Sequence, residues 1–172
     1  KSNLRELVEK EAKKRGIKCR CIRCREIGIK MLKERIKPDF ESMEMVRRNY
    51  DASKGKEIFL SFEDKTNDAL VGFIRIRKPS NKFFRPEMDE HTIGIRELHV
   101  YGEQLPLGKK EWEKFKAVQH GGVGANLLRE AERIAKEEFD AKKMLIISGV
   151  GVRQYYEKTG YKLEGVYMSK KL

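Results

Sequence analysis

The pattern of hydrophobic and polar residues marks the middle of the chain as β structure. Residues 58–62 and 69–77 are rich in β-branched and aromatic residues, and the turn-forming stretch 63–68 separates them, so the two runs predict a hairpin. Residues 92–101 alternate and predict the next strand, whereas the continuous apolar run 144–148 suits a buried parallel strand. Further extended segments are expected at residues 43–46, 161–163 and 166–168.

Apolar residues at helical spacing predict helices around these strands. The first helix is expected to begin after Ser2 or Asn3 as its N-cap, with Glu6 in its first turn, and to end at Gly16. Its apolar positions recur at the spacing of one helix face. Three further helices are expected, a short one between residue 27 and Pro38, an amphipathic one at residues 125–135, and a short one within residues 149–158 that Gly160 ends.

This order of elements predicts a mixed sheet with helices on its faces, an α/β fold of the α+β kind. A chain of 172 residues suits one domain with a single core, here residues 38–172, preceded by a basic linker at residues 1–37. No apolar run approaches the ~20 residues of a membrane span, and no signal peptide is evident, so a soluble, cytoplasmic protein without a membrane partner is expected. Because the sequence begins with Lys1 and not methionine, we expect a fragment.

The positive charge of the chain is concentrated near its beginning. The net charge is +12, and residues 1–37 hold 14 Lys or Arg against 5 Asp or Glu, a net of +9 that leaves +3 for the rest. Lysine and arginine neutralise phosphates, so a polyanionic partner is expected at the linker. A highly charged, solvated surface is the alternative, although it does not explain the uneven distribution.

A glycine-rich stretch, Gln119-His120-Gly121-Gly122-Val123-Gly124, leads into the amphipathic helix. Its glycines let backbone N–H groups approach a pyrophosphate, and the helix N-terminus adds partial positive charge. No Gly-Lys-Ser or Gly-Lys-Thr follows, which excludes a P-loop, and the spacing does not fit a dinucleotide-binding loop. Helix-capping glycines in an ordinary turn are the alternative. The pattern Gln-x-x-Gly-x-Gly resembles the loop with which GNAT acetyltransferases hold coenzyme A.

In a GNAT fold, the strand before this loop and the strand after the long helix splay apart and hold the pantetheine arm between them. Here the first of these strands ends in Glu97-Leu98-His99-Val100. A hydroxyl must protonate the departing thiolate, and Tyr155 and Tyr156 follow the second strand. Adjacent helix residues point ~100° apart, so one tyrosine is expected to face the sulfur and the other to pack. A packing role for both is the alternative.

Glu97 and His99 project from one face of their strand because side chains alternate with period two. Either is a candidate general base or water-ordering group. The alternatives are a salt bridge from Glu97 to an arginine and a half-buried, hydrogen-bonded imidazole for His99.

The three cysteines, Cys19, Cys21 and Cys24, form Cys-x-Cys-x-x-Cys. Clustered thiolates in an intracellular protein bind zinc or iron–sulfur clusters, so a metal site is expected, with a fourth zinc ligand still to be found. Reduced thiols in a basic loop are the alternative. Nucleic-acid contacts are expected from the flanking basic residues, Lys18, Arg20, Arg23 and Arg25.

Three segments together resemble the acetyltransferase domain of the Elongator catalytic subunit. They are Arg96-Glu97-Leu98-His99-Val100-Tyr101-Gly102, then Gln119-His120-x-Gly122-x-Gly124 with residues 130–135, then Ile147-Ser148-Gly149-Val150-Gly151-x-Arg153-x-Tyr155-Tyr156-x-Lys158-x-Gly160-Tyr161. Asn3-Leu4-Arg5-Glu6-Leu7, Cys19-Arg20 and Arg25-Glu26 resemble its linker.

The resemblance implies an enzyme that joins a radical-SAM domain to a GNAT domain and uses acetyl-CoA to carboxymethylate C5 of the tRNA wobble uridine. It implies tRNA, the radical-SAM domain and other Elongator-type subunits as partners, and zinc at the linker cysteines. By position, it implies contacts to acetyl-CoA from Glu97, Leu98, His99, Val100, Val123, Gly124, Ala125 and Tyr156.

Two departures limit what the resemblance implies. Gly121 stands where the family often has glutamine, and the radical-SAM motif Cys-x-x-x-Cys-x-x-Cys is absent from the sequence, so a [4Fe–4S] cluster and S-adenosylmethionine are expected only in the missing domain. The fragment is expected to bind acetyl-CoA weakly and not to form the carbon–carbon bond. Two other functions stay open, a protein lysine acetyltransferase and a non-catalytic zinc-containing RNA-binding module.

Overall fold

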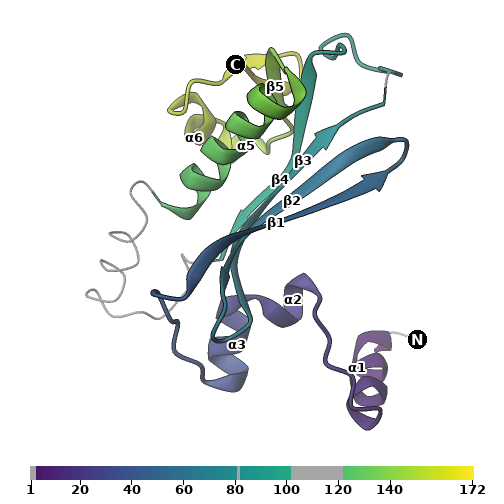
Figure 1. Ribbon diagram of the computed structural model, residues 1–172, viewed down its shortest axis with the longest axis vertical. Helices are drawn as coiled ribbons and strands as arrows, with labels where there is room; N and C mark the ends of the chain where they lie inside the picture. Colours follow the sequence, from purple (N-terminus) through teal and green to yellow (C-terminus); the bar gives the residue numbers. More distant parts are fainter. Residues whose placement is uncertain (1–2, 81, 102–121) are drawn as a thin grey trace.

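The computed structural model describes residues 3–80, 82–101 and 122–172, and within them seven strands form one sheet in the order β1-β2-β3-β4-β5-β7-β6 (Figure 1). The pairing is antiparallel except between β4 and β5, which are parallel. The mixed sheet predicted from the sequence is therefore confirmed. The strands are β1 (Met43–Ala52), β2 (Gly55–Asp64), β3 (Ala69–Lys78), β4 (Thr92–Val100), β5 (Lys143–Ile146), β6 (Lys162–Glu164) and β7 (Tyr167–Lys171).

Except for the short helix α2, which was not predicted, the helices fall where the spacing of apolar residues predicts them. They are α1 (Leu4–Lys14), α2 (Ile22–Arg25), α3 (Ile27–Glu34), α5 (Val123–Phe139), the short 3-10 helix η1 (Val150–Val152) and α6 (Arg153–Glu157). Helix α1 begins after Asn3 as predicted, but the Asn3 side chain makes no capping hydrogen bond, because its backbone lies outside the extended region that capping requires. Among the described residues, no helix combines the length and the apolar character needed to cross a membrane.

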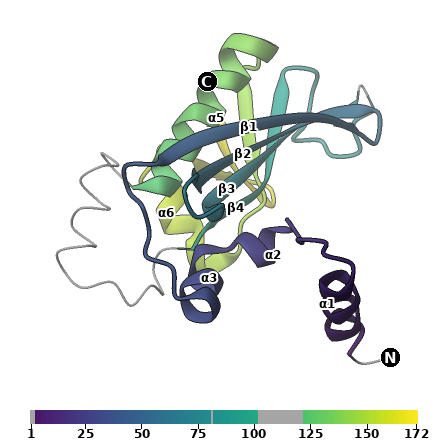
Figure 2. The same ribbon diagram turned by 60° about the horizontal axis from the view of Figure 1, so that its bottom comes forward.

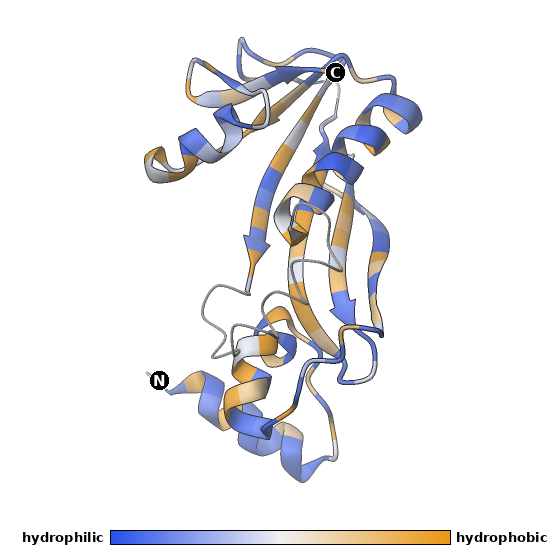
Figure 3. Cartoon of the chain, turned by 90° about the vertical axis from the view of Figure 1, so that its left-hand side faces the viewer, coloured by the Kyte–Doolittle hydropathy of each residue, from blue (hydrophilic) through white to orange (hydrophobic). Residues whose placement is uncertain are grey.

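The core lies between the sheet and α5. One face of α5, including Leu127, Ala131 and Ile134, is fully buried against apolar side chains of β2, β3 and β4. Figure 3 shows the corresponding hydrophobic bands alternating with hydrophilic ones along the strands. Ile27 of α3 is also fully buried and belongs to the same cluster of core residues, so α3 packs as part of the sheet domain.

Helix α1 stands apart from this core (Figures 1 and 2). None of its residues is buried, and Leu4, Leu7 and Val8 are exposed. Three ion pairs at i,i+4 spacing stabilise the helix locally, among them Arg5–Glu9 at 2.8 Å. The linker therefore has two parts. Helix α1 is solvated, whereas the short helices α2 and α3 pack near the end of the β2–β3 hairpin.

Candidate active site

Strands β4 and β5 separate midway along β4. They pair from Thr92 opposite Lys143 as far as Ile95 opposite Ile146, and β4 then continues to Val100 paired only with β3 among the described residues. A bulge in the β3–β4 register at this point leaves Arg96 without a cross-strand partner. The edge of β4 after Ile95 thus faces a wedge, where its backbone N–H and C=O groups are open to an extended ligand.

The N-terminus of α5 closes the far end of this wedge. Gly122, its N-cap residue, has φ +89°, a left-handed conformation that favours glycine. A Cβ atom at Gly124 would lie 3.2 Å from the Tyr155 hydroxyl and 3.3 Å from a Val100 methyl group. The fold therefore brings Val100, Gly124 and Tyr155 together beside the unpaired N–H groups of a 17-residue helix, a favourable place for an anion.

Several residues predicted to contact the phosphates of coenzyme A lie in or near this helix N-terminus. Val123 and Ala125 belong to the first turn of α5. Val123 packs over Gly72 of β3, and a Cβ atom added at Gly72 would lie only 3.0 Å from a methyl group of Val123. Gln119, together with His120 and Gly121, lies outside the described residues.

The two tyrosines of α6 occupy different environments. Tyr156 is 6% exposed and packs edge-on against Tyr155 and Tyr161, with ring centroids 5.2 Å and 6.0 Å away. Tyr155 is 39% exposed, and its hydroxyl lies over Gly124. Burial raises the pKa of both hydroxyls above the ordinary tyrosine value. Both therefore remain protonated at neutral pH and suit a proton donor better than a base.

Glu97 and His99 lie on one face of β4, opposite Arg75 and Phe73 of β3. A carboxylate oxygen of Glu97 lies 3.6 Å from the Arg75 guanidinium, which is the ion pair that the sequence left open as the alternative to catalysis. The His99 ring packs on Phe73, with centroids 5.1 Å apart. Leu98 points the other way and packs against the core.

The three cysteines come together at the start of α2. Their sulfur atoms lie within 4.8 Å of one another, with Cys19 and Cys21 exposed and Cys24 half-buried. The backbone N–H of Cys24 is the main cause that lowers the pKa of the Cys21 thiol to about 7, while burial raises that of Cys24 to about 11. Arg5 of α1 donates to the Cys24 sulfur at 3.5 Å. Three sulfur donors at this spacing fit three corners of a tetrahedral metal site.

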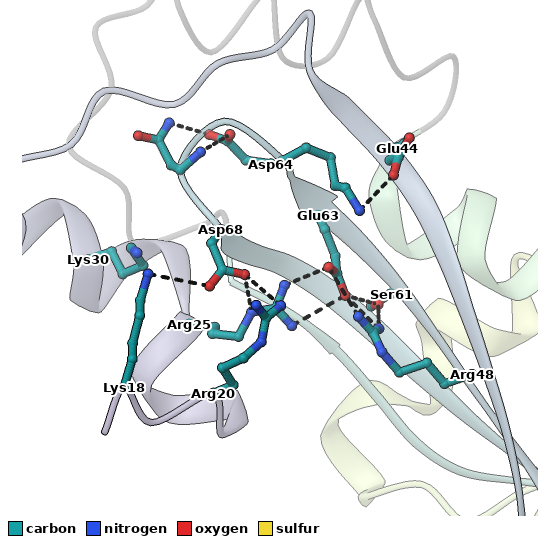
Figure 4. A network of polar contacts seen from close by, with 12 residues as sticks. Lys18, Arg20, Arg25, Lys30, Glu44, Arg48, Ser61, Glu63, Asp64 and Asp68 are labelled. Carbon is teal, nitrogen blue, oxygen red and sulfur yellow. Dashed lines mark hydrogen bonds and ion pairs between the residues drawn. The ribbon is translucent and has the colours of Figure 1, made fainter. Parts of the chain in front are cut away.

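The basic residues beside the cysteines are turned mostly toward the protein. Figure 4 shows Lys18, Arg20 and Arg25 converging on Asp68, with nitrogen–oxygen distances of 3.6, 3.0 and 2.9 Å. Three of the four basic residues expected to contact nucleic acid therefore form ion pairs with a carboxylate of the protein itself. Asp68 stands in the β2–β3 turn with φ 49°, and its role was not apparent from the sequence.

A second carboxylate extends this ionic cluster into the core. Glu63 is 2% exposed and accepts hydrogen bonds from Arg25 at 2.5 Å, Arg48 at 2.7 Å and the Ser61 hydroxyl at 2.6 Å (Figure 4). Burial alone would raise the pKa of Glu63, but these hydrogen bonds outweigh it and hold the pKa at about 2. We call Glu63, Asp68 and their basic partners Lys18, Arg20, Arg25 and Arg48 the linker clasp.

Comparison with known proteins agrees with the geometry of the wedge. Residues 27–161 match the family model described as the acetyltransferase (GNAT) family. Over 172 residues the chain is 55% identical to a tRNA uridine(34) acetyltransferase of Methanocaldococcus jannaschii, covering 100% of this chain and 31% of that protein. It is 48% identical to Elongator complex protein 3 of Saccharomyces cerevisiae, covering 99% of this chain and 30% of that protein.

A solved structure is similar over the same extent. The Elp3 protein of Methanocaldococcus infernus with an N-terminal deletion superposes with a TM-score of 0.86 at 52% identity, covering 100% of this chain and 40% of that chain. The chain thus spans about a third of the length of the curated relatives it matches. The resemblance to the acetyltransferase domain of the Elongator catalytic subunit is confirmed. With a family match that begins at α3 and ends at Tyr161, the chain belongs to the acetyltransferase (GNAT) family.

Proposed function

We propose that the chain is the acetyl-CoA-handling domain of an enzyme that modifies the wobble uridine of tRNA. The observation that carries this proposal is the separation of β4 from β5 after Ile95, with the N-terminus of α5 at the end of the wedge. The relatives named tRNA uridine(34) acetyltransferase supply the substrate class. We expect the radical-SAM domain in the part of these relatives that the chain does not cover. We expect contacts with further Elongator-type subunits to be made by the whole enzyme.

Each part of the wedge has a role in this proposal. Backbone groups of Glu97, Leu98, His99 and Val100 hold the pantetheine arm, because the edge of β4 has no strand partner there. The N–H groups of Val123, Gly124 and Ala125 face the pyrophosphate, with Gln119 as an expected contact from the preceding loop.

The two tyrosines take different roles. The Tyr155 hydroxyl lies over Gly124 at the helix N-terminus, where the phosphates of the carrier are expected. The sulfur lies at the opposite end of the pantetheine arm, so we assign proton donation to the leaving thiolate to Tyr156, whose buried hydroxyl stays protonated. Glu97 remains a candidate base, and its ion pair with Arg75 must loosen for that role.

Acetyl-CoA turnover by the chain tests this proposal directly. We expect release of free thiol from acetyl-CoA to increase when tRNA is added, and to stay unchanged with a lysine-rich peptide. Equal rates with and without tRNA would remove tRNA as the substrate. Stimulation by the peptide alone would favour a protein lysine acetyltransferase, and RNA binding without acetyl-CoA binding would favour a non-catalytic module.

We propose that Cys19, Cys21 and Cys24 hold a zinc ion in the linker, since their three sulfur atoms already lie within 4.8 Å of one another. The ion would fix the start of α2 next to Arg5 of α1. We expect close to one zinc per chain by elemental analysis after gentle purification, and loss of most of it in Cys21→Ser. Less than ~0.3 zinc per chain in the unaltered protein contradicts a structural site of ordinary affinity.

A further inference from the structure

A pocket lies at the fork, the point where β4 and β5 stop pairing. Its volume is about 310 Å³. Three of the residues that line it belong to the fork itself. Ile95 is the last residue of β4 that pairs with β5, Arg96 is the first residue beyond it, and Ile147 follows the last residue of β5. The pocket therefore adjoins the inner end of the wedge.

The proposed function brings the acyl end of the carrier to this fork. It places the phosphates at the N-terminus of α5, beside Val100 and Gly124, and the pantetheine arm along the edge of β4. From Val100 back to Ile95 the strand runs five residues, about 17 Å at ~3.3 Å per residue. The arm thus leads away from the phosphates, and the group joined to its sulfur lies next to the pocket.

The pocket lies on the face of the sheet that α5 does not cover. Side chains alternate along a strand, and Ile93 and Ile95 belong to the core under α5, so Gly94 between them faces the other way. Gly94 lines the pocket without adding a side chain to it. Apart from its neighbours in the chain, a Cβ atom added at Gly94 would approach no described atom closer than the carbonyl oxygens of Arg77 and Leu145, both at 4.0 Å. The space over Gly94 is therefore open.

Much of the lining of the pocket is apolar. Besides Ile95, it includes Pro79, Met88, Leu145, Ile147 and Tyr167. Leu145 and Tyr167 are almost fully buried, so they offer a fixed apolar surface. Ile147 is 66% exposed, and an occupant of the pocket would cover part of it. Covering apolar surface of this kind favours an apolar ligand.

Three polar side chains of the pocket are already bonded within the protein. The Thr92 hydroxyl donates to Asp89 at 2.5 Å. Arg77 and Arg96 donate to the same carboxylate oxygen of Glu57, at 3.2 and 2.6 Å. An acidic acyl group would have to compete with Glu57 for these guanidinium groups, whereas an alkyl chain leaves the bonds intact. The pocket therefore favours an uncharged chain.

We propose that this pocket receives the acyl chain of the carrier, and that the protein takes CoA thioesters whose straight, uncharged acyl groups have three or four carbons. An acetyl group has three non-hydrogen atoms, so at the ~30 Å³ of a water molecule for each it needs roughly 90 Å³, less than a third of the pocket. The chemistry is that of acetyl-CoA. The thioester C–S bond breaks, the acyl group passes to water or to the acceptor, and the thiolate takes a proton. This inference rests on the proposed function and names the class of thioester that the site takes.

Calorimetry with a series of CoA thioesters tests the length of the acyl group. The probes are acetyl-, propionyl-, butyryl- and succinyl-CoA, titrated into the chain without RNA, with unacylated coenzyme A as the reference. Each methylene group buried against apolar side chains improves affinity about three- to fourfold, so we expect butyryl-CoA to bind about tenfold more tightly than acetyl-CoA. Butyryl-CoA that binds no more tightly than acetyl-CoA overturns the inference, and so does tighter binding of succinyl-CoA than of butyryl-CoA.

Substitutions at Gly94 test the place of the acyl chain. Gly94→Val puts a β-branched side chain, which suits a strand, into the open space over Gly94. We expect it to weaken butyryl-CoA about tenfold and acetyl-CoA less than about threefold. Gly94→Ala should have a smaller effect of the same kind, and it decides the question should valine disturb the fold.

Leu163→Val is the control, because Leu163 is an exposed residue of β6 that does not line the pocket. It should leave both affinities unchanged. An equal loss of acetyl-CoA and butyryl-CoA in the two Gly94 variants would place the acyl chain elsewhere.

The inference and the proposed function fail in different ways. If neither coenzyme A nor any thioester binds, the proposed function is removed and the acyl pocket with it. If acetyl-CoA binds and butyryl-CoA gains nothing, only the acyl pocket is removed. We expect butyryl-CoA to release thiol in the presence of tRNA within about tenfold of the rate for acetyl-CoA. Tight binding of butyryl-CoA without thiol release would contradict its use as a substrate.

Discussion

Replacing Tyr156 by phenylalanine is expected to lower tRNA-stimulated turnover of acetyl-CoA by about 10²- to 10⁴-fold, the usual contribution of a positioned proton donor. The ring remains, so its packing against Tyr155 and Tyr161 is preserved and the fold should be unaffected. The dissociation constant of acetyl-CoA should change less than about threefold, because the proton is needed only as the thiolate leaves.

Tyr155→Phe is the matched control, since it removes the same atom from the neighbouring residue. Its hydroxyl lies over Gly124, so we expect a weaker affinity for acetyl-CoA with turnover at saturation reduced less than about tenfold. Binding is measured by calorimetry and turnover by thiol release. If the two variants exchange these effects, Tyr155 is the proton donor, and if neither lowers turnover, no tyrosine of α6 has that role.

Replacing Glu63 by alanine is expected to cost about 3–5 kcal/mol of the free energy of unfolding, because it leaves the buried guanidinium of Arg25 without its main partner. Arg25 is 8% exposed, so water cannot take the place of the carboxylate easily. Urea denaturation measures the change. The docking of α2 on the sheet should loosen with it, since Arg25 joins α2 to Glu63 and Asp68 of the β2–β3 hairpin.

Glu138→Ala is the control for this variant. Glu138 makes a bidentate ion pair with Arg47, in which each nitrogen–oxygen distance is 2.6 Å. The two side chains are 35% and 32% exposed. An exposed pair of this kind contributes up to about 1 kcal/mol. Similar losses in the two variants would contradict the view that burial gives the linker clasp its strength.

The Glu63 carboxylate makes the free energy of unfolding depend on pH. Its pKa falls from 4.5 to about 2 on folding, so its contribution is present above pH 4.5 and is lost as the pH falls toward 2. The free energy of unfolding of the unaltered chain should therefore decrease more steeply over this interval than that of Glu63→Gln. Parallel curves would mean that Glu63 has no such linkage.

The elements that the sequence predicted best are those whose pattern reflects local burial. Helix α5 has one buried face, and strands β2 and β3 are buried along most of their length, so their apolar residues marked them without the structure. Strand β1 was harder, because it lies at the edge of the sheet and most of its residues are exposed. The wedge itself was expected only from the family resemblance, since the spacing of residues does not show where two strands stop pairing.

The linker clasp could not be predicted because it depends on contacts between distant segments. Asp68 and Arg25 are 43 residues apart, and nothing in the turn distinguishes Asp68 from an ordinary turn-forming residue. The basic residues of the linker suggested nucleic acid, yet an internal carboxylate engages three of them.

Helix α3 begins two residues after Arg25, the arginine that anchors the linker. Arg25 pairs both with Glu63 near the end of β2 and with Asp68 in the β2–β3 turn. The carboxylates of one hairpin therefore help to set the direction in which the linker leaves the sheet.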